Sequence, residues 1–417
     1  MINMAAWIPK VVRVTKNQNV GPVTYAVQSY DYSSQPRVIK NPTTANLKRG
    51  TGGRSSFNGI VCTIFGCSGF IGNSLSIRLG KIGTQLILPH RCDPYHVKEL
   101  KVGGDLGQVY YHPFDLKDEE SIIRTIKYSN VVINLIGQTY ETSNFSFDDV
   151  HVEGARTLAR LAKKCNVERF IHMSCLNAEE KPTVGQLNYI VDFILFFKPM
   201  IIQDGSKMLK SKWKGEIAVR EEFPEATIVR PSVIYGPMDK FVSHYMSPDR
   251  TTFEYIPLWR KGENTEKQPV YIHDVISGLV AIIRNPDTAG KTYQFVGSQR
   301  YKLNNLVNMM FDIKMKYVGN NMVIGDMKIN PYFWMKTAFA ELIAPIHRTI
   351  DLSWEILEFH HANDKIDPNL PTLEDLGITP TDFKKVMAWE VEPYVTNRLE
   401  VEELQLGVPP DVKSVPK

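Results

Sequence analysis

The sequence lacks the cysteine and histidine patterns that build disulfide frameworks or zinc sites. Its cysteines include no C-x-x-C pair and no histidine at zinc-finger spacing, and there are five: Cys62, Cys67, Cys92, Cys165 and Cys175. An odd number of unpaired thiols indicates reduced cysteines in an intracellular compartment. His273 and Asp274 have no second histidine or carboxylate at the i, i+4 spacing of helix-borne zinc ligands. We therefore interpret this pair as structural and expect no metal site.

The sequence also lacks an apolar run long enough to cross a bilayer. Its most hydrophobic stretch, residues 188–202, is interrupted by Asp192, Lys198 and Pro199, whereas a spanning helix needs about 20 apolar residues. Two interpretations stay open for this stretch: a buried helix, or a surface that contacts lipid or a neighbouring subunit. There is no internal repeat and no low-complexity tract.

Acidic residues are scarce in the first 54 positions. This leader carries eight lysines and arginines but a single acid, Asp31, while the net charge of the whole chain is only +4. The rest of the chain is therefore slightly acidic and offers no overall positive field for nucleic acid. A basic, acid-poor segment indicates a mitochondrial targeting segment or a basic arm laid on a partner, and a merely basic disordered tail is the alternative.

Strand-like and helical patterns alternate after the leader. Apolar runs at 60–65, 84–91, 131–137, 169–174 and 226–236 predict strands, and helical spacing lies between them, as in residues 152–165. This alternation predicts a parallel sheet with helices on both faces, a doubly wound Rossmann-type α/β fold. From about residue 240 the alternation decays, which predicts a smaller mixed or helical C-terminal domain.

We expect three parts along the chain. The first is the basic leader or arm at residues 1–54. A nucleotide-binding domain comes next at 55–240, with its sheet completed by parts of 265–300. The remainder, 241–417, forms the C-terminal domain, which we expect to dock onto other proteins or lie near a membrane surface.

A glycine-rich turn separates the first predicted strand from its helix. Gly66, Gly69 and Gly72 form G-x-x-G-x-x-G, with Ser68, Phe70 and Ile71 between them. The first glycine permits a tight turn, the second lets backbone amides approach a pyrophosphate, and the third allows close helix packing. In this strand, loop and helix context the motif predicts a dinucleotide site.

The end of the second strand bears on the choice of nucleotide. An NAD-selective site places an acid there for the ribose 2′-hydroxyl, whereas a 2′-phosphate needs a cation. His90 and Arg91 occupy this position, which favours NADPH because guanidinium suits phosphate oxygens. Asp93 keeps NAD open if the strand ends later, and a solvent-facing Arg91 is the structural alternative. Asp115 is placed to meet the adenine end, or to cap the next helix.

These motifs together resemble the extended or atypical short-chain dehydrogenase/reductases over roughly residues 57–300. Longer blocks, including residues 134–178, 223–236 and 267–275, are similar to the nucleotide-binding accessory subunits of mitochondrial respiratory complex I. The resemblance implies bound NADPH and adds further cofactor-binding residues to the glycine turn, namely Leu116, Asn134, Ile136, Gly137, Ser174, Lys212 and Pro231.

The catalytic helix of the resembled dehydrogenases carries Tyr-x-x-x-Lys, and here the pattern is broken. Lys212 matches the lysine, but Met208 stands at the tyrosine position, and a thioether has no proton to transfer. Another Y-x-x-x-K, Tyr332 with Lys336, lies beyond the sheet and is interpreted as a packed aromatic helix face. We therefore expect no catalytic residues, with a reductase or epimerase that uses Ser174 as its acid as the alternative.

Membership of the complex I subunit family implies a position in the cell. It implies other complex I subunits as partners, with the chain on the matrix side of the mitochondrial inner membrane and a role in assembly and stability. Contact with the membrane surface or lipid is expected, and a homo-oligomer is not. The segment between Ser174 and Lys212 is longer than usual for the family, and covering the substrate cleft, facing a partner or forming an extra helix all stay open for it.

Overall fold

The computed structural model describes residues 48–50, 52–180, 206–247, 250, 255–318, 322–343 and 352–394. Most of the expected leader and most of the long segment between Ser174 and Lys212, including the apolar stretch 188–202, lie outside this range. Within it, no helix is both long and apolar enough to cross a membrane.

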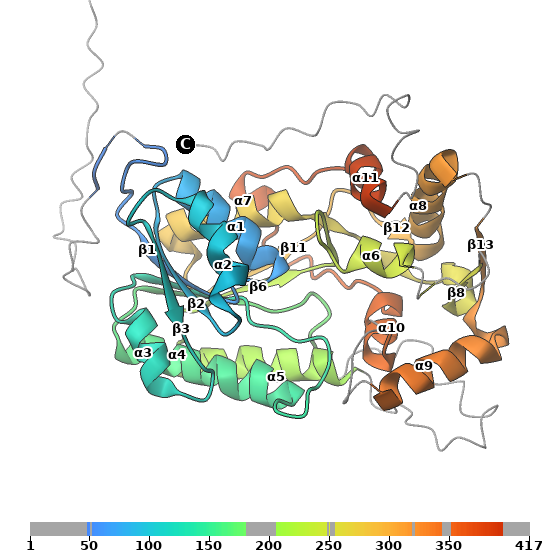
Figure 1. Ribbon diagram of the computed structural model, residues 1–417, viewed down its shortest axis with the longest axis horizontal. Helices are drawn as coiled ribbons and strands as arrows, with labels where there is room; N and C mark the ends of the chain where they lie inside the picture. The colour runs from blue at the N-terminus through green and yellow to red at the C-terminus, as the bar shows by residue number, and fades with distance from the viewer. Residues whose placement is uncertain are drawn as a thin grey trace, which may run out of the picture. The chain divides into compact units, whose positions relative to one another are not determined.

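A seven-stranded sheet forms the centre of the fold (Figure 1). Its strand order is β11-β6-β5-β4-β1-β2-β3, and all six neighbouring pairs are parallel. The strands are β1 (Val61–Phe65), β2 (Gln85–His90), β3 (Val109–Pro113), β4 (Val131–Asn134), β5 (Arg169–Met173), β6 (Thr227–Pro231) and β11 (Thr292–Phe295). The predicted doubly wound α/β fold is confirmed. The strand order reverses beside β1, and such a switch point is where this fold binds ligands.

Helices cover both faces of the sheet. α1 (Phe70–Lys81) and α7 (Ile272–Arg284) pack together on one face, while α3 (Glu119–Ile126), α4 (Ala155–Lys164) and α5 (Lys207–Glu222) cover the other (Figure 1). Strand residues alternate between the two cores: Ile133 and Ile171 join the core beneath α1 and α7, whereas Val132 and Phe170 join the core beneath α4. Burial on both faces explains why the central strands are mostly apolar and do not alternate with polar residues.

One predicted strand is divided. The run 226–236 forms β6 and then, after Ser232 and Val233, the short β7 (Ile234–Tyr235). β7 leaves the main sheet and pairs in parallel with β10 (Val270–Tyr271). The expectation of one continuous strand was wrong, and the division falls just after Pro231, whose nitrogen cannot donate to a strand ladder.

The smaller region combines short strand pairs and helices. β8 (Tyr255–Leu258) pairs with β13 (Val323–Asp326), and β9 (Glu266–Lys267) with β12 (Tyr301–Lys302). The helices here are α6 (Phe241–Met246), α8 (Leu303–Val318), α9 (Pro331–Ile343), α10 (Trp354–His361) and α11 (Phe383–Val391). Short helices complete the described chain: α2 (Pro94–Val97), η2 (Lys98–Gly103), η5 (Trp259–Gly262), η6 (Pro286–Thr288), η7 (Met327–Ile329), η8 (Glu374–Leu376) and η9 (Glu392–Tyr394).

A π-helical segment, η3 (Asp149–Gly154), leads directly into α4 and lies against α5. The contact is backbone to backbone: a Cβ added at Gly215 of α5 would lie 2.1 Å from the His151 carbonyl oxygen. α5 therefore approaches η3 as closely as a glycine allows, and this approach fixes the height of α5 over the sheet edge.

Gly215→Ala tests this contact. Intrinsic helix propensity alone would raise the stability by about 1 kcal/mol, but the added methyl meets a carbonyl that cannot rotate away, and overpacking costs about 1–3 kcal/mol. We expect a net loss of unfolding free energy, measured by thermal or denaturant unfolding. Lys214→Ala is the control, because the Lys214 side chain is exposed and pairs only loosely, at 3.7 Å, with Asp148. A stabilised Gly215→Ala protein would contradict the packing.

Candidate functional site

The glycine turn between β1 and α1 has the close contacts that its spacing predicts. Gly66 adopts a left-handed φ of +85°, and its carbonyl accepts a hydrogen bond from the Gly69 amide at 3.1 Å. A Cβ at Gly72 would lie 2.1 Å from the Gly66 oxygen. Gly69 precedes α1 without any side-chain cap, and Ser68 and Gly69 are exposed. The first turn of α1 is therefore open to an anion at its positive end.

The end of β2 places a cation, not an acid, at the sheet edge. β2 ends at His90, which is buried and whose Nδ1 has no hydrogen-bond partner. Arg91 is the next residue, exposed, with its guanidinium 5.3 Å from the centroid of the Phe145 ring. The Asp93 carboxylate instead accepts from the Tyr95 amide at 2.8 Å and caps α2. The longer strand that would have brought Asp93 to the ribose is not present.

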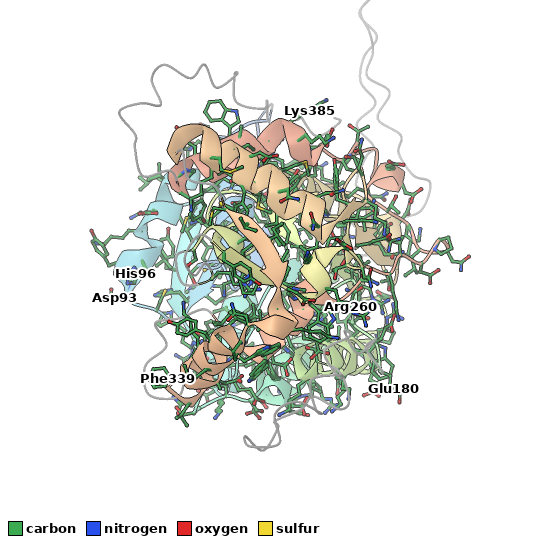
Figure 2. All side chains as sticks on the ribbon, turned by 90° about the vertical axis from the view of Figure 1, so that its right-hand side faces the viewer. Asp93, His96, Glu180, Arg260, Phe339 and Lys385 are labelled. Carbon is green, nitrogen blue, oxygen red and sulfur yellow. The ribbon has the colours of Figure 1, made fainter. Side chains whose placement is uncertain are left out.

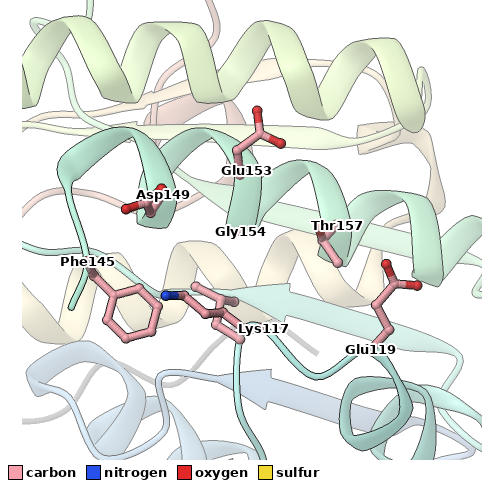
Figure 3. Close-up of a pocket in the computed structure, with 8 residues that line it drawn as sticks. Lys117, Glu119, Phe145, Asp149, Glu153, Gly154 and Thr157 are labelled. Carbon is pink, nitrogen blue, oxygen red and sulfur yellow. The ribbon is translucent and has the colours of Figure 1, made fainter.

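The end of β3 borders a pocket of about 230 Å³ (Figure 3). Asp115 is exposed and its carboxylate accepts from the Lys117 amide at 2.9 Å. The cap of α3 is Asp118, which accepts from Glu120, so the alternative role of Asp115 as the helix cap was wrong by three positions. Leu116, a predicted cofactor residue, lines the pocket together with Lys117, Glu119, Phe145, Asp149, Glu153, Gly154 and Thr157.

The end of β4 connects the glycine turn with α5. The Asn134 side chain accepts from the Ile136 amide at 3.0 Å, and its amide group lies 3.2 Å from Nδ1 of His172. A Cβ at Gly66 would lie 3.1 Å from the Leu135 carbonyl, and one at Gly137 would lie 3.2 Å from Lys212 Nζ. The structure thus brings the predicted residues of β1, β4 and α5 to one edge.

The opposite end of the site is buried. Ser174 lies just after β5, and its hydroxyl is buried with no hydrogen-bond partner, while its amide donates to the Val229 carbonyl at 2.8 Å. Pro231, the last residue of β6, accepts from the Leu176 amide at 2.9 Å. Burial lowers the pKa of the Lys212 ammonium, and the nearby Cys175 and Glu216 partly oppose this effect.

Two histidines beside Lys212 are held neutral. Burial, with the Lys212 charge, lowers the pKa of His151 to about 2 and that of His172 to about 3. His151 Nδ1 lies 2.7 Å from the Ser211 hydroxyl, which itself donates to the Met208 carbonyl, and His151 Nε2 accepts from the Gln138 amide at 3.0 Å. Nδ1 therefore carries the proton. Through these two hydrogen bonds the His151 ring connects Gln138, which follows β4, with Ser211 of α5.

Met208 lies in an apolar cluster four residues before Lys212. It is 5% exposed and is grouped with Phe147, Cys175 and Leu209, with Phe359 of α10 packed against them. No member of this cluster other than the Cys175 thiol carries an ionisable proton, and burial raises the pKa of that thiol. The position therefore offers packing but no general acid.

Glu355 of α10 connects the C-terminal region to the N-terminus of α5 through hydrogen bonds. Its carboxylate accepts from the Ser206 hydroxyl at 2.6 Å and from the amides of Lys207 and Met208 at 3.3 and 3.4 Å. A carboxylate at a helix N-terminus is favoured by the helix dipole as well as by these hydrogen bonds. α10 is thereby held where Phe359 packs against the Met208 cluster.

Comparison with known proteins identifies the family. Residues 62–296 match the NAD dependent epimerase/dehydratase family. The chain is 39% identical over 365 residues to NADH dehydrogenase (ubiquinone) 1 alpha subcomplex subunit 9, mitochondrial, of Mus musculus, covering 87% of each chain. The chain belongs to this subunit 9 family. It is also 30% identical over 398 residues to the NADH-ubiquinone oxidoreductase 40 kDa subunit, mitochondrial, of Neurospora crassa, covering 91% of this chain and 94% of that one.

Solved structures show the same fold. A dTDP-glucose 4,6-dehydratase from Streptomyces venezuelae, with NAD and TYD bound, superposes with a TM-score of 0.55 at 16% identity, covering 83% of this chain and 100% of that one. At this identity the likeness concerns the fold alone. The predicted resemblance to complex I accessory subunits is confirmed by the sequence relatives.

Sequence reasoning missed several residues of the candidate site. It did not single out Lys117 or Phe145 at the pocket, His151 in η3, or Glu355 and Phe359 in α10. Lys117 had a local signal, since it comes directly after Asp115 and Leu116. The α10 residues had none, because Glu355 meets Ser206 across 149 positions of sequence.

Two secondary predictions concerned residues outside this edge. Asp274 accepts hydrogen bonds from the amide and hydroxyl of Thr381, at 2.6 and 3.1 Å. Among the described residues no group of three His, Cys, Asp or Glu side chains is arranged to hold a metal ion.

Tyr332 was expected on a packed aromatic face, but it is 51% exposed on α9, so that expectation was wrong.

Glu358 provides a pH test of the α10 contact. It is buried, one carboxylate oxygen has no partner, and burial with the neighbouring Glu355 raises its pKa to about 8, opposed by Ser206 and Lys210. The folded state therefore keeps a proton that the unfolded chain releases at about pH 4.3, so stability declines as the pH rises from there to about 8. We expect the thermal midpoint of Glu358→Gln, relative to the unmodified protein, to increase between pH 5 and pH 8.

The exposed Glu374 supplies the control for that measurement. Glu374→Gln should match the unmodified protein at every pH. A Glu358→Gln difference that stays constant from pH 5 to pH 8 would show that Glu358 ionises normally in the folded protein.

Proposed function

We propose that this chain is a non-catalytic accessory subunit of mitochondrial respiratory complex I that holds NADPH as a structural cofactor and supports assembly and stability. The observation that carries the proposal is the pairing of an intact glycine turn with a buried thioether four residues before Lys212. The chain thus retains the glycine turn expected of a dinucleotide site, but it has methionine where the tyrosine that donates the proton would stand.

The residues at the sheet edge suit NADPH. The amides of the glycine turn and the first turn of α1, at Ser68, Gly69, Phe70 and Ile71, would hold the pyrophosphate. Arg91, with His90 beside it, would meet the 2′-phosphate, since β2 ends there without an acid. Asp115 and Leu116 would bind the adenine end. Asn134, Ile136, Gly137, Ser174, Lys212 and Pro231 would line the nicotinamide and its ribose. Bound NADPH would supply a hydride. The site has no general acid at the Met208 position to supply the proton that reduction of a carbonyl also needs.

The buried end of the site supports a non-catalytic role. Reduction of a carbonyl needs a proton donor beside the accepting oxygen. Met208 has none, and the Ser174 hydroxyl, though close in sequence to β5, has no hydrogen-bond partner among the described residues to assist its ionisation. Phe359 of the C-terminal region packs against the cluster that contains Met208, so it adds an apolar side chain beside the thioether.

An exposed apolar face on α9 supports contact with other subunits or lipid. Tyr332, Met335, Phe339 and Leu342 are 51–74% exposed and recur at spacings of three and four, so they share one face of the helix. Figure 2 shows Phe339 at the margin of the molecule, pointing outward. A continuous exposed apolar face marks an interaction surface. Together with the mitochondrial complex I relatives, it favours a place in complex I beside other subunits or lipid. A position on the matrix side of the inner membrane is part of the same proposal.

NADPH would act as a folding ligand in this role. A ligand that binds only the native state stabilises it by RT ln(1 + [L]/Kd), which is about 4 kcal/mol at a thousandfold excess over Kd. That contribution needs no turnover, and it makes retention of the subunit depend on its nucleotide.

Native gel fractionation of detergent-solubilised mitochondria tests the proposal, with the chain and NADPH detected in the same bands. We expect both to co-migrate with complex I, and Gly69→Val to reduce both signals, because a side chain at Gly69 would face the pyrophosphate. A second complex I subunit serves as the marker of the complex. Migration of the chain as a free small species would overturn the proposal.

Met208→Tyr tests the absence of chemistry. Spectroscopic assays of NADPH oxidation against a panel of ketones and quinones should detect no turnover by the unmodified protein. Met208→Tyr should gain slow turnover, because a phenol then stands four residues before Lys212. Met208→Phe is the control of similar size without a hydroxyl. Turnover by the unmodified protein would instead identify a working reductase.

A further inference from the structure

Two cations from neighbouring strands converge on one aromatic ring. Arg91 lies directly after β2 and Lys117 lies after β3, and these strands are paired in register at His90 and Pro113. The Arg91 guanidinium lies 5.3 Å and the Lys117 ammonium 4.6 Å from the centroid of the Phe145 ring. Each contact is a cation–π attraction, which orients an exposed side chain but leaves its charge uncompensated.

Lys117 is held in place rather than free in solvent. Besides the Phe145 ring, its ammonium donates to the Asn144 carbonyl at 3.3 Å. Figure 3 shows the ammonium directed toward Phe145 at the wall of the pocket. A lysine already restrained in this way loses less conformational entropy when it binds a ligand.

The acidic side chains that line the pocket form ion pairs or hydrogen bonds with residues other than Arg91 and Lys117. Glu119 pairs with Arg160 at 2.7 Å and Glu153 with Arg156 at 2.8 Å. The third acid, Asp149, accepts from the amide and the hydroxyl of Ser146 at 2.9 and 2.8 Å. These hydrogen bonds, together with the nearby Lys117 charge, lower the pKa of Asp149, but Lys117 and Asp149, both among the described residues, form no ion pair within 4.0 Å. Across the described part of the chain, neither Arg91 nor Lys117 forms an ion pair within 4.0 Å. The two cations therefore remain available to an anion at this edge.

We propose that Lys117 is a second 2′-phosphate ligand beside Arg91, and that Phe145 positions both cations for this group. This inference rests on the proposed NADPH function. A phosphate monoester carries between one and two negative charges at neutral pH, so one arginine alone leaves part of the charge unpaired. NADH has a hydroxyl at the same position, and the two cations would gain little from it. Lys117 thus determines selectivity for the phosphorylated nucleotide.

The test measures dissociation constants of NADPH and NADH for the full chain, through the fluorescence of the reduced nicotinamide. Lys117→Met keeps the apolar stem and removes the charge. We expect its NADPH affinity to fall about tenfold, as for loss of one charge-assisted contact, with NADH affinity within about twofold. Lys117→Arg should keep the preference for NADPH. Retained NADH binding shows that the variant is folded.

Lys127→Met is the matched control. The Lys127 ammonium also lies over a ring, 5.3 Å from the centroid of Tyr128, but at the far end of α3. α3 rises about 1.5 Å per residue, so this lysine is well removed from the pocket. Neither affinity should change in this variant.

The outcomes separate the inference from the function on which it rests. If the unmodified chain binds no NADPH, the proposed function fails. If it binds NADPH and Lys117→Met binds it equally well, Lys117 is not a phosphate ligand although the proposed function stands. If Lys117→Met weakens NADPH and NADH alike, Lys117 acts on the part that the two nucleotides share, and the 2′-phosphate assignment is wrong.

Discussion

The backbone contact inside the glycine turn is the constraint on which the dinucleotide site depends. At Gly72 there is no room for a Cβ, which would lie 2.1 Å from the Gly66 oxygen, and Gly66 itself lies against the Leu135 carbonyl. Because backbone atoms stand on both sides, neither contact can relax by side-chain rotation. The start of α1 is thereby fixed relative to β1 and β4. A third glycine, Gly215, brings α5 against η3 in the same way, so Lys212 reaches the edge where those strands end.

Local patterns were enough to predict this part of the molecule. The glycine spacing, the apolar run of β1 and the polar ends of β2, β3 and β4 all act within a few residues. Parallel strands bring their carboxyl ends to one edge of the sheet whatever connects them. Arg91 and Asn134 lie at that edge for this reason. Asp115 and Asp118 mark the limit of such reasoning, since both can cap the next helix and only backbone geometry selects Asp118.

Contacts between distant segments could not be predicted. The hydrogen bond of Glu355 with Ser206 and the packing of Phe359 against Met208 both depend on the position of α10. No residue near Ser206 or Met208 in the sequence indicates that position. The division of residues 226–236 had a similar cause. Its apolar character suits a strand in either sheet, and the pairing of Ile234 in β7 with Val270 in β10 decides which.

The two ends of the site differ in charge, and this difference bears on the function. Arg91 and Lys117 are exposed after the ends of β2 and β3, whereas Lys212 lies among neutral histidines and apolar side chains at the other end. In the proposed role, interactions with the adenosine and pyrophosphate would serve affinity, because only interactions that are stronger in the transition state than in the ground state accelerate a reaction. A rate would have to come from the Met208 end, which has no proton to give. In the proposed role, the binding free energy of the nucleotide is expressed as stability of the folded chain.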